Sequence, residues 1–367
     1  MAKQRLQESI TTLEGRLSRG EMDRAAALDL AAAYRLSGRL KDAGDLLASR
    51  LQAGDPDWET CRACVECYHE AGEMESAVAV LNHWASLFRD RAEFWMLRGF
   101  LLEVMGDWEA ALGEHNMARQ IAPHMAEANY RHGVALMHLG RYDEAVGDFL
   151  KTLRLRPNLA RPQINVGLCL EALGRPKEAV IAFEKALALD PECGDAHLNL
   201  GALYGELGQQ AMALEHCEQA LALDPTSGEA AYNAALALVD RDPDQAVRYL
   251  KRAVASDPEN LDALHRLGMV AQGRGRWETA AGYFQRVIDR DSERLDSLFA
   301  LAVCHSKSER CSDAIGAFHA LLERDPGNAK AWFYLGVAYD KIGSSEEARE
   351  AYRRADEMAA SRGREDA

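Results

Sequence analysis

The stretch AKAWFYLGVAY at residues 329–339 decides the fold, because its apolar and small residues return every three or four positions. This spacing is that of one face of an α-helix and predicts a helix here. Gly343 follows and predicts the end of that helix. The segment from Ser345 to Ala348 then supplies a cap and acidic residues for the first turn of a second helix. Residues 329–362 are therefore expected to form a pair of helices.

The same pattern returns along the chain at a fixed interval. Alanines recur every 34 residues, with one step of 33, at Ala43, Ala77, Ala111, Ala145, Ala179, Ala213, Ala246, Ala280, Ala314 and Ala348. A small residue that recurs in this way marks a place where two helices cross closely. The period predicts ten tandem repeats over residues 24–362.

The last repeat resembles the tetratricopeptide-repeat family. Its signature is matched by Trp332, Leu335, Gly336, Tyr339, Ala348 and Tyr352. The resemblance covers residues 24–362 and implies an all-α fold, a right-handed superhelical α-solenoid of tandem helical hairpins. It is specific for fold and leaves function open, because such repeats serve many functions.

Two short segments flank the expected solenoid. Residues 1–23 carry an apolar stripe on one helix, which we expect to cap the first repeat, formed by Leu6, Ile10, Leu13 and Leu17. Residues 363–367 are expected to be a short tail. The few residues after the last repeat leave its hairpin either to cap itself or to dock on another molecule.

The repeat at 228–260 is one residue shorter than the others and has no glycine in its turn. Asp242 is suited to cap its second helix, and Pro243 is suited to the first turn. We expect a tighter turn at this place.

Composition limits the kinds of partner. The chain is 48% hydrophobic and 28% charged, which is typical of a chain that folds. Its net charge is −15, and no run of cations could neutralise a phosphate backbone, so nucleic acid is not expected as a partner. Neither a signal peptide nor a membrane-spanning stretch is visible, and we expect a cytoplasmic protein that does not insert into a membrane.

A run of cysteines at Cys61, Cys64 and Cys67 has the spacing of part of a ferredoxin motif, but Ala71 stands where a fourth ligand would be. On a helix the three thiols fall in neighbouring inward slots, where cysteine acts as a small hydrophobic residue. We expect no cofactor, and a metal-binding or redox protein remains an alternative. No phosphate-binding glycine loop, H-E-x-x-H motif or nucleophile elbow is present, so we do not expect an enzyme.

Three polar residues occupy core slots of the third and fourth repeats. Arg98 and His132 replace leucine, and His115 replaces phenylalanine. Burial of such groups is costly unless they are paired, so we expect contacts with Glu103 and Glu114 or a partly open seam. The cluster is either structural or part of a site.

The family resemblance implies that the first helix of each hairpin lines a concave groove. Two slots four residues apart lie on one face of these helices and are mostly apolar. A slot between them holds Asn165, Asn199 and Asn233 in successive repeats, flanked by Arg131 and Arg266. Asparagine both donates and accepts hydrogen bonds, so this ladder could bind the backbone of an extended peptide, although asparagine is also common in this slot across the family.

These observations predict a protein-interaction scaffold or adaptor. The expected groove residues are Tyr130, Arg131, Ile164, Asn165, Leu198, Asn199, Tyr232, Asn233, Arg266 and Phe299. Acidic residues near the starts of the first helices favour a neutral or basic protein or peptide. The alternative is a homo-oligomer that assembles through the C-terminal hairpin.

Overall fold

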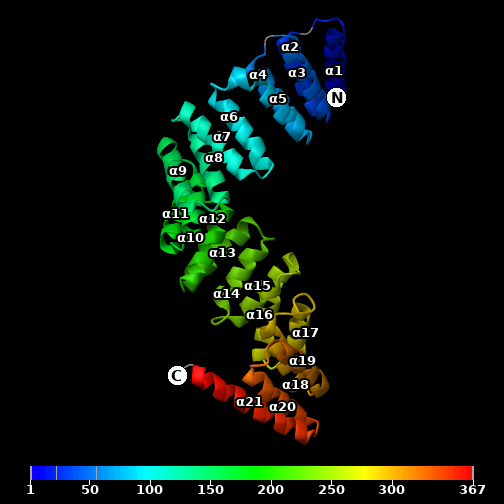
Figure 1. The fold of residues 1–367 in the computed structure, drawn as a ribbon, viewed down its shortest axis with the longest axis vertical. Coiled ribbons are helices and arrows are strands. Elements are labelled where there is room, and N and C mark those ends of the chain that lie inside the picture. The colour runs from blue at the N-terminus through cyan, green and yellow to red at the C-terminus, as the bar shows by residue number, and fades with distance from the viewer. Residues whose placement is uncertain (1, 22, 55, 366–367) are drawn as a thin grey trace. The chain divides into compact units, whose positions relative to one another are not determined.

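The computed structural model describes residues 2–21, 23–54 and 56–365, and within them every regular element is an α-helix (Figure 1). This confirms the all-α prediction. None of the described helices is both long and apolar enough to cross a bilayer.

The helices alternate as first and second members of hairpins, preceded by α1 (Ala2–Ser18). The first helices are α2 (Arg24–Leu36), α4 (Trp58–Glu70), α6 (Ala92–Val104), α8 (Ala126–His138), α10 (Ala160–Ala172), α12 (Gly194–Glu206), α14 (Gly228–Leu238), α16 (Leu261–Gly273), α18 (Leu295–Lys307) and α20 (Ala329–Lys341). The second helices are α3 (Leu40–Ala53), α5 (Met74–Phe88), α7 (Trp108–Ile121), α9 (Tyr142–Leu155), α11 (Pro176–Leu189), α13 (Gln210–Leu223), α15 (Pro243–Ser256), α17 (Trp277–Ile288), α19 (Cys311–Arg324) and α21 (Ser345–Glu365). Within the described residues, the first helix of each hairpin starts at the residue where a repeat was expected to start.

The last hairpin shows how the sequence sets the helix ends. The side chain of Asn328 accepts a hydrogen bond from the backbone N–H of Ala331 and so caps α20. Gly343 has a φ of 79°, which a side chain would disfavour, and it turns the chain into α21. α21 has 21 residues and continues to Glu365. Residues 366–367 of the predicted tail lie outside the described residues.

The periodic alanines are buried, as expected of small residues at a close helix crossing. All ten are at most 1% exposed. A glycine of the first helix makes a second close approach, because a Cβ on Gly336 would lie 2.6 Å from the ring of Tyr352. The same relation joins Gly133 to Phe149. Small residues at these two places let the helices pack closely, as the period predicted.

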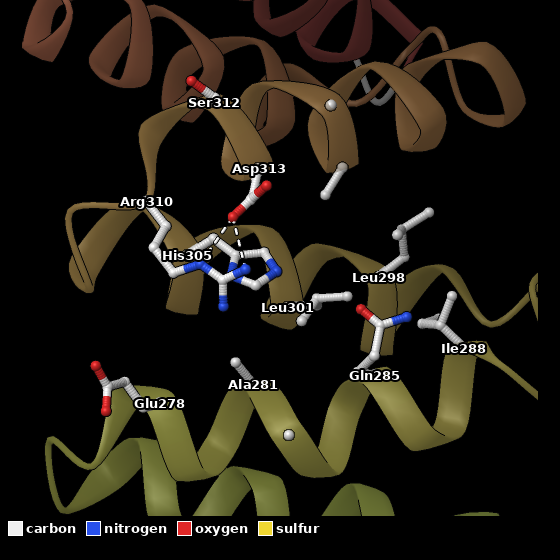
Figure 2. A pocket seen from close by; sticks show the side chains of 13 residues that line it. Glu278, Ala281, Gln285, Ile288, Leu298, Leu301, His305, Arg310, Ser312 and Asp313 are labelled. Carbon is white, nitrogen blue, oxygen red and sulfur yellow. Dashed lines mark hydrogen bonds and ion pairs between the residues drawn. The ribbon is translucent and has the colours of Figure 1, made fainter.

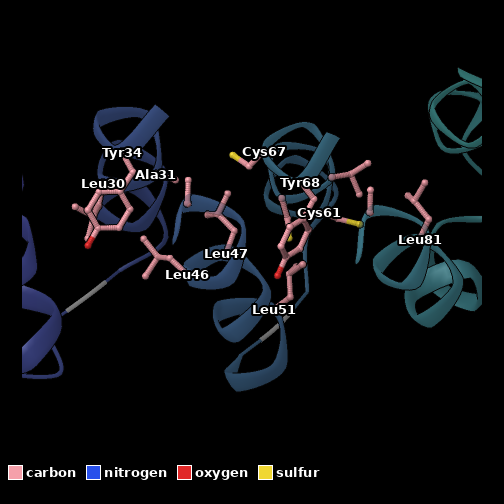
Figure 3. Packing of buried hydrophobic residues seen from close by; sticks show 14 of the residues in the cluster. Leu30, Ala31, Tyr34, Leu46, Leu47, Leu51, Cys61, Cys67, Tyr68 and Leu81 are labelled. Carbon is pink, nitrogen blue, oxygen red and sulfur yellow. The ribbon is translucent and has the colours of Figure 1, made fainter. Parts of the chain in front are cut away.

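The chain divides into two compact units, residues 1–190 and 191–367. In the first unit, one core cluster joins the opening hairpins and contains Leu30, Leu47 and Tyr68 (Figure 3). Ile10 of α1 is buried in this cluster, and Leu6 and Leu13 pack against it. Leu17, the fourth member of the predicted stripe, is 42% exposed.

The shortened repeat in the second unit has the expected cap. The carboxylate of Asp242 accepts a hydrogen bond from the backbone N–H of Gln245, and Pro243 is the first residue of α15. α14 has 11 residues, compared with 13 in the first helices on either side.

Candidate functional site

The first helices of neighbouring hairpins lie beside one another within each unit. In the second unit α12 contacts α14, α16 contacts α18, and α18 contacts α20. In the first unit α8 contacts α10 in the same way. In each unit, the face that these first helices share is called the first-helix face of that unit below. Most of the predicted apolar slots on it are partly exposed, including Tyr130, Ile164, Leu198, Tyr232 and Phe299.

In the second unit the first-helix face contains a pocket of about 430 Å³ between α16, α18 and the start of α20. Met269 and Phe299 provide apolar surface, and Lys330 and Asp296 provide charge at its border. The side chain of Met269 is 46% exposed, and Phe333 on α20 is 50% exposed. Large apolar side chains are therefore accessible on this face.

His265 lines this pocket and also contacts a buried residue of the next hairpin. Its Nδ1 lies 2.7 Å from the hydroxyl oxygen of buried Ser297, and its Nε2 lies 3.7 Å from a carboxylate oxygen of Asp296. Burial lowers the pKa of His265, and the Asp296 carboxylate opposes this shift. Because Asp296 is largely exposed and therefore screened by water, the effect of burial is the larger one.

In the first unit a smaller pocket of about 220 Å³ lies where the first turns of α8 and α10 meet the end of α9. Tyr130 and Arg131 of the predicted groove line it, together with Arg156 and Arg161. These last two arginines were not among the predicted groove residues. The sequence could have revealed them, because most other repeats carry an acidic residue at these two positions.

The predicted asparagines lie in both units, with Asn165 in the first and Asn199 and Asn233 in the second. Asn165 is 9% exposed, and its side-chain amide donates to the hydroxyl of Tyr130 at 3.3 Å. The amide of Asn199 donates to the carbonyl oxygen of Asp195 in its own helix at 2.7 Å. Asn233 is partly exposed. Two of the three asparagines therefore already use one amide N–H donor each within the chain.

The two flanking arginines differ. Arg131 is held by two carboxylates, since its Nη1 lies 2.8 Å from Glu103 and its Nε lies 2.9 Å from Glu127. Arg266 is exposed. Of the two, Arg266 alone could bind a ligand without first losing one of these ion pairs.

The polar residues in core slots have partners in the first unit. His115 is fully buried, and its Nε2 lies 2.7 Å from Glu103. Arg98 pairs with Glu114 at 3.3 Å. Both contacts with acidic residues were expected. Burial raises the pKa of Glu114, and the charge of Arg98 opposes that shift.

His132 has a partner that the sequence analysis did not name. Its Nδ1 lies 2.5 Å from the carboxylate of Asp148, which also accepts from Arg119 at 3.0 Å. His132 and Asp148 stand 16 residues apart, as do Gly133 and Phe149, which meet at the helix crossing. The separation of 16 residues could therefore have predicted the contact between His132 and Asp148.

The three clustered cysteines are buried in the core around α4 (Figure 3). Burial raises the pKa of Cys61 to about 12 and that of Cys67 to about 11, and it raises the pKa of Cys64 as well. Cys64 Sγ lies 3.4 Å from the carbonyl oxygen of Gly44. Among the described residues, no group of histidine, cysteine and acidic side chains has the geometry to hold a metal ion.

A larger pocket of about 620 Å³ lies between the second helices α17 and α19, with α18 as its floor. Figure 2 shows Leu301 and His305 of α18 between Ala281 and Gln285 on one side and Asp313 on the other. Burial lowers the pKa of His305.

A similar pocket occurs in the first unit. The equivalent slots of α7, α8 and α9 line a groove of about 540 Å³ in the first unit. In both places an arginine at the mouth pairs with an acidic residue three positions later, Arg310 with Asp313 and Arg141 with Glu144. Because the spacing of successive second helices produces it, this groove does not by itself indicate a specific site.

Several solved structures are similar to parts of this chain. YrrB, described as a TPR protein with an unusual peptide-binding site, is 26% identical with a TM-score of 0.47 over 49% of this chain and 93% of its own. MamA from Desulfovibrio magneticus RS-1 is 26% identical with a TM-score of 0.44, over 46% and 96% of the two chains. Another MamA structure is 20% identical with a TM-score of 0.43, over 47% and 94%. No curated protein matches this chain.

The family models that match the sequence are all models of the tetratricopeptide repeat. They match residues 124–192, 194–227, and three overlapping segments at 232–294, 265–307 and 299–363. None is a model of a catalytic domain. Because these matches together cover more than half of the chain, the protein belongs to the tetratricopeptide-repeat family.

Proposed function

We propose that this protein is a scaffold or adaptor, without catalytic activity, that holds a partner protein or an extended peptide on its first-helix face. The observation that carries this proposal is the accessible apolar surface there, above all Met269 and Phe333 in the second unit. Apolar side chains that remain accessible beside polar borders are typical of protein-interaction sites.

The polar residues of the face would orient the ligand. We propose that Asn165, Asn199 and Asn233 bind the peptide backbone. The amides of Asn165 and Asn199 each donate one N–H within the chain, which leaves their carbonyl oxygens and one remaining N–H each to bind the peptide backbone. Asn233 could offer both its donor and its acceptor.

The border of the face supports a preference for neutral or basic ligands over most of its length. Acidic residues at the starts of the first helices are exposed at Glu59, Glu93, Glu127, Asp195, Glu229, Asp262 and Asp296. Several of these carboxylates pair with arginines, as Asp262 does with Arg294 at 2.7 Å. Their net field is therefore weaker than their number suggests. All eight cysteines are free, which fits a reducing compartment, and we propose the cytoplasm.

Affinity capture from a native lysate, followed by mass spectrometry, identifies a partner, and surface variants then test where it binds. The double variant Met269→Ser, Phe333→Ser removes accessible apolar surface from the first-helix face. Its control is Met212→Ser on α13, because Met212 is a similarly exposed apolar residue on a second helix. We expect the double variant to lose the partner and the control to keep it. Retention of the partner by both variants would overturn the proposal.

A further inference from the structure

The small pocket of the first unit has an unusual charge for this protein. The chain carries 58 acidic residues against 43 lysines and arginines, yet no acidic residue lies between Asp148 and Glu171. That interval contains Arg156 and Arg161, which both line the pocket. This interval is the longest stretch of the sequence without an acidic residue, and two of its cations reach the pocket.

Both arginines replace acidic residues of the repeat. At the position before the periodic proline, where Arg156 stands, other repeats carry Asp190, Asp224, Asp257 and Asp325. At the position of Arg161, other repeats carry Glu59, Glu93, Glu127, Asp195, Glu229, Asp262 and Asp296. The two reversals of charge fall at one junction between repeats, and the fold brings them to one pocket.

The lining is positive after its internal pairs are taken into account. Glu127 lies in the lining, but its carboxylate is bound by Arg131 at 2.9 Å. Arg156 and Arg161 are exposed, and within the described residues neither forms an ion pair or a hydrogen bond from its side chain. Two guanidinium groups therefore face the pocket without a carboxylate of their own.

Tyr130 provides a further donor. Its hydroxyl oxygen accepts from the amide of Asn165 at 3.3 Å, which leaves the hydroxyl hydrogen available for an acceptor. Ala126, Leu159 and Pro162 provide apolar walls. A volume of about 220 Å³ is small, and it fits one side chain better than a folded surface.

We propose that this pocket binds one anionic side chain, a carboxylate or a phosphate, of the peptide held on the first-helix face. The proposal rests on the proposed function and adds a specificity-determining subsite to it. Guanidinium groups bind carboxylate and phosphate oxygens through paired hydrogen bonds, and the apolar walls suit the aliphatic stem of such a side chain. Over the rest of the face, the acidic border still favours neutral or basic residues.

The test begins with a random library of 12-residue peptides displayed on phage and selected on the full chain. We expect the selected peptides to share an acidic residue at one fixed position. Synthetic versions of one selected peptide then carry glutamine, glutamate or phosphoserine at that position. The glutamate and phosphoserine peptides are expected to bind about 5- to 30-fold more tightly than the glutamine peptide, as two partly exposed ion pairs would give.

The variant Arg156→Asp, Arg161→Glu restores the residues that other repeats carry, so it is expected to fold. The control is Lys151→Glu, Arg154→Glu, which makes the same change of net charge on α9 without altering the lining. We expect the first variant to lose the preference for glutamate over glutamine and the control to retain it.

The outcomes separate the two proposals. The selected peptides could show no preference for an acidic residue and yet fail to bind the Met269→Ser, Phe333→Ser variant or Tyr130→Ser. That result would overturn the subsite and leave the scaffold function standing. An acidic preference that survives in Arg156→Asp, Arg161→Glu would also overturn the subsite. Selection of no peptide at all by the folded chain would count against both proposals.

Discussion

His115 occupies the space that Gly99 leaves open, since a Cβ on Gly99 would lie 2.3 Å from Cε1 of the imidazole. Other repeats have the same relation between a glycine and an aromatic ring, as in Gly133 and Phe149. The buried histidine is thus held in place by the architecture of the repeat, and its 2.7 Å contact with Glu103 satisfies one of its two nitrogens.

This relation predicts that Gly99→Ala destabilises the protein. The added methyl group must displace the His115 ring, and overpacking of this kind costs about 1–3 kcal/mol. The control is Gly113→Ala in α7, where a Cβ meets no atom within 4 Å and alanine should stabilise the helix by about 0.5–1 kcal/mol. Urea unfolding measures both changes. Equal stability of the two variants would contradict the close packing.

The cysteines at 61, 64 and 67 are predicted to react slowly in the folded protein. Burial raises their pKa values, so at pH 8 almost all of each thiol is protonated and shielded from reagent. Titration with Ellman's reagent should label partly exposed Cys193 first and these three only after denaturation. We also expect no stoichiometric metal in the purified protein. Rapid labelling of all three, or one bound iron or zinc per chain, would revive the redox alternative.

Acid is predicted to lower the stability of the folded protein, partly through protonation of His265. Because its pKa is lowered in the folded state, the unfolded chain binds a proton more readily, and stability is lost as the pH falls through the ordinary histidine range near 6.5. The measurement compares urea unfolding at pH 7.5 and pH 5.5. His265→Gln should reduce the difference between the two pH values, and an undiminished difference would show that His265 does not contribute.

The asparagine ladder predicts unequal effects of mutation on peptide affinity. Asn233→Ala should weaken binding of a captured peptide by about 2- to 10-fold, the value of one hydrogen bond. Asn199→Ala should weaken it less, because the Asn199 amide already donates to Asp195. Isothermal titration calorimetry measures both. If Asn199→Ala has the larger effect, the order of contacts inferred here is wrong, and if neither variant changes affinity the asparagines do not bind the peptide.

Much of the fold could be predicted from the sequence because the repeat is periodic. A glycine or alanine that recurs at one interval fixes the helix crossings, and the helix boundaries follow from residues such as Asn328, Asp242 and Gly343. Periodicity also located the contact between His115 and Glu103, since a buried histidine requires a partner.

The site was harder to predict for a physical reason. Which side chains bind one another within the chain is not visible in a slot pattern, so the engagement of Asn165 by Tyr130 and of Arg131 by two carboxylates was missed. Arg156 was missed because it lies at the end of a second helix, outside the slots that were compared. Arg161 was missed because it is an exception in a slot that is acidic in most repeats. Their departure from the acidic pattern became meaningful only when the fold brought them together.

The central claim is that partners bind the first-helix face, and site-specific photo-crosslinking tests it most directly. A photoreactive phenylalanine analogue is placed at Phe333 or Met269 on this face, and in separate proteins at Met212 or Ile181, which are exposed on second helices. After irradiation with a captured partner, we predict crosslinks from positions 333 and 269 and none from 212 and 181. Crosslinks that arise only from the second-helix positions would contradict the account.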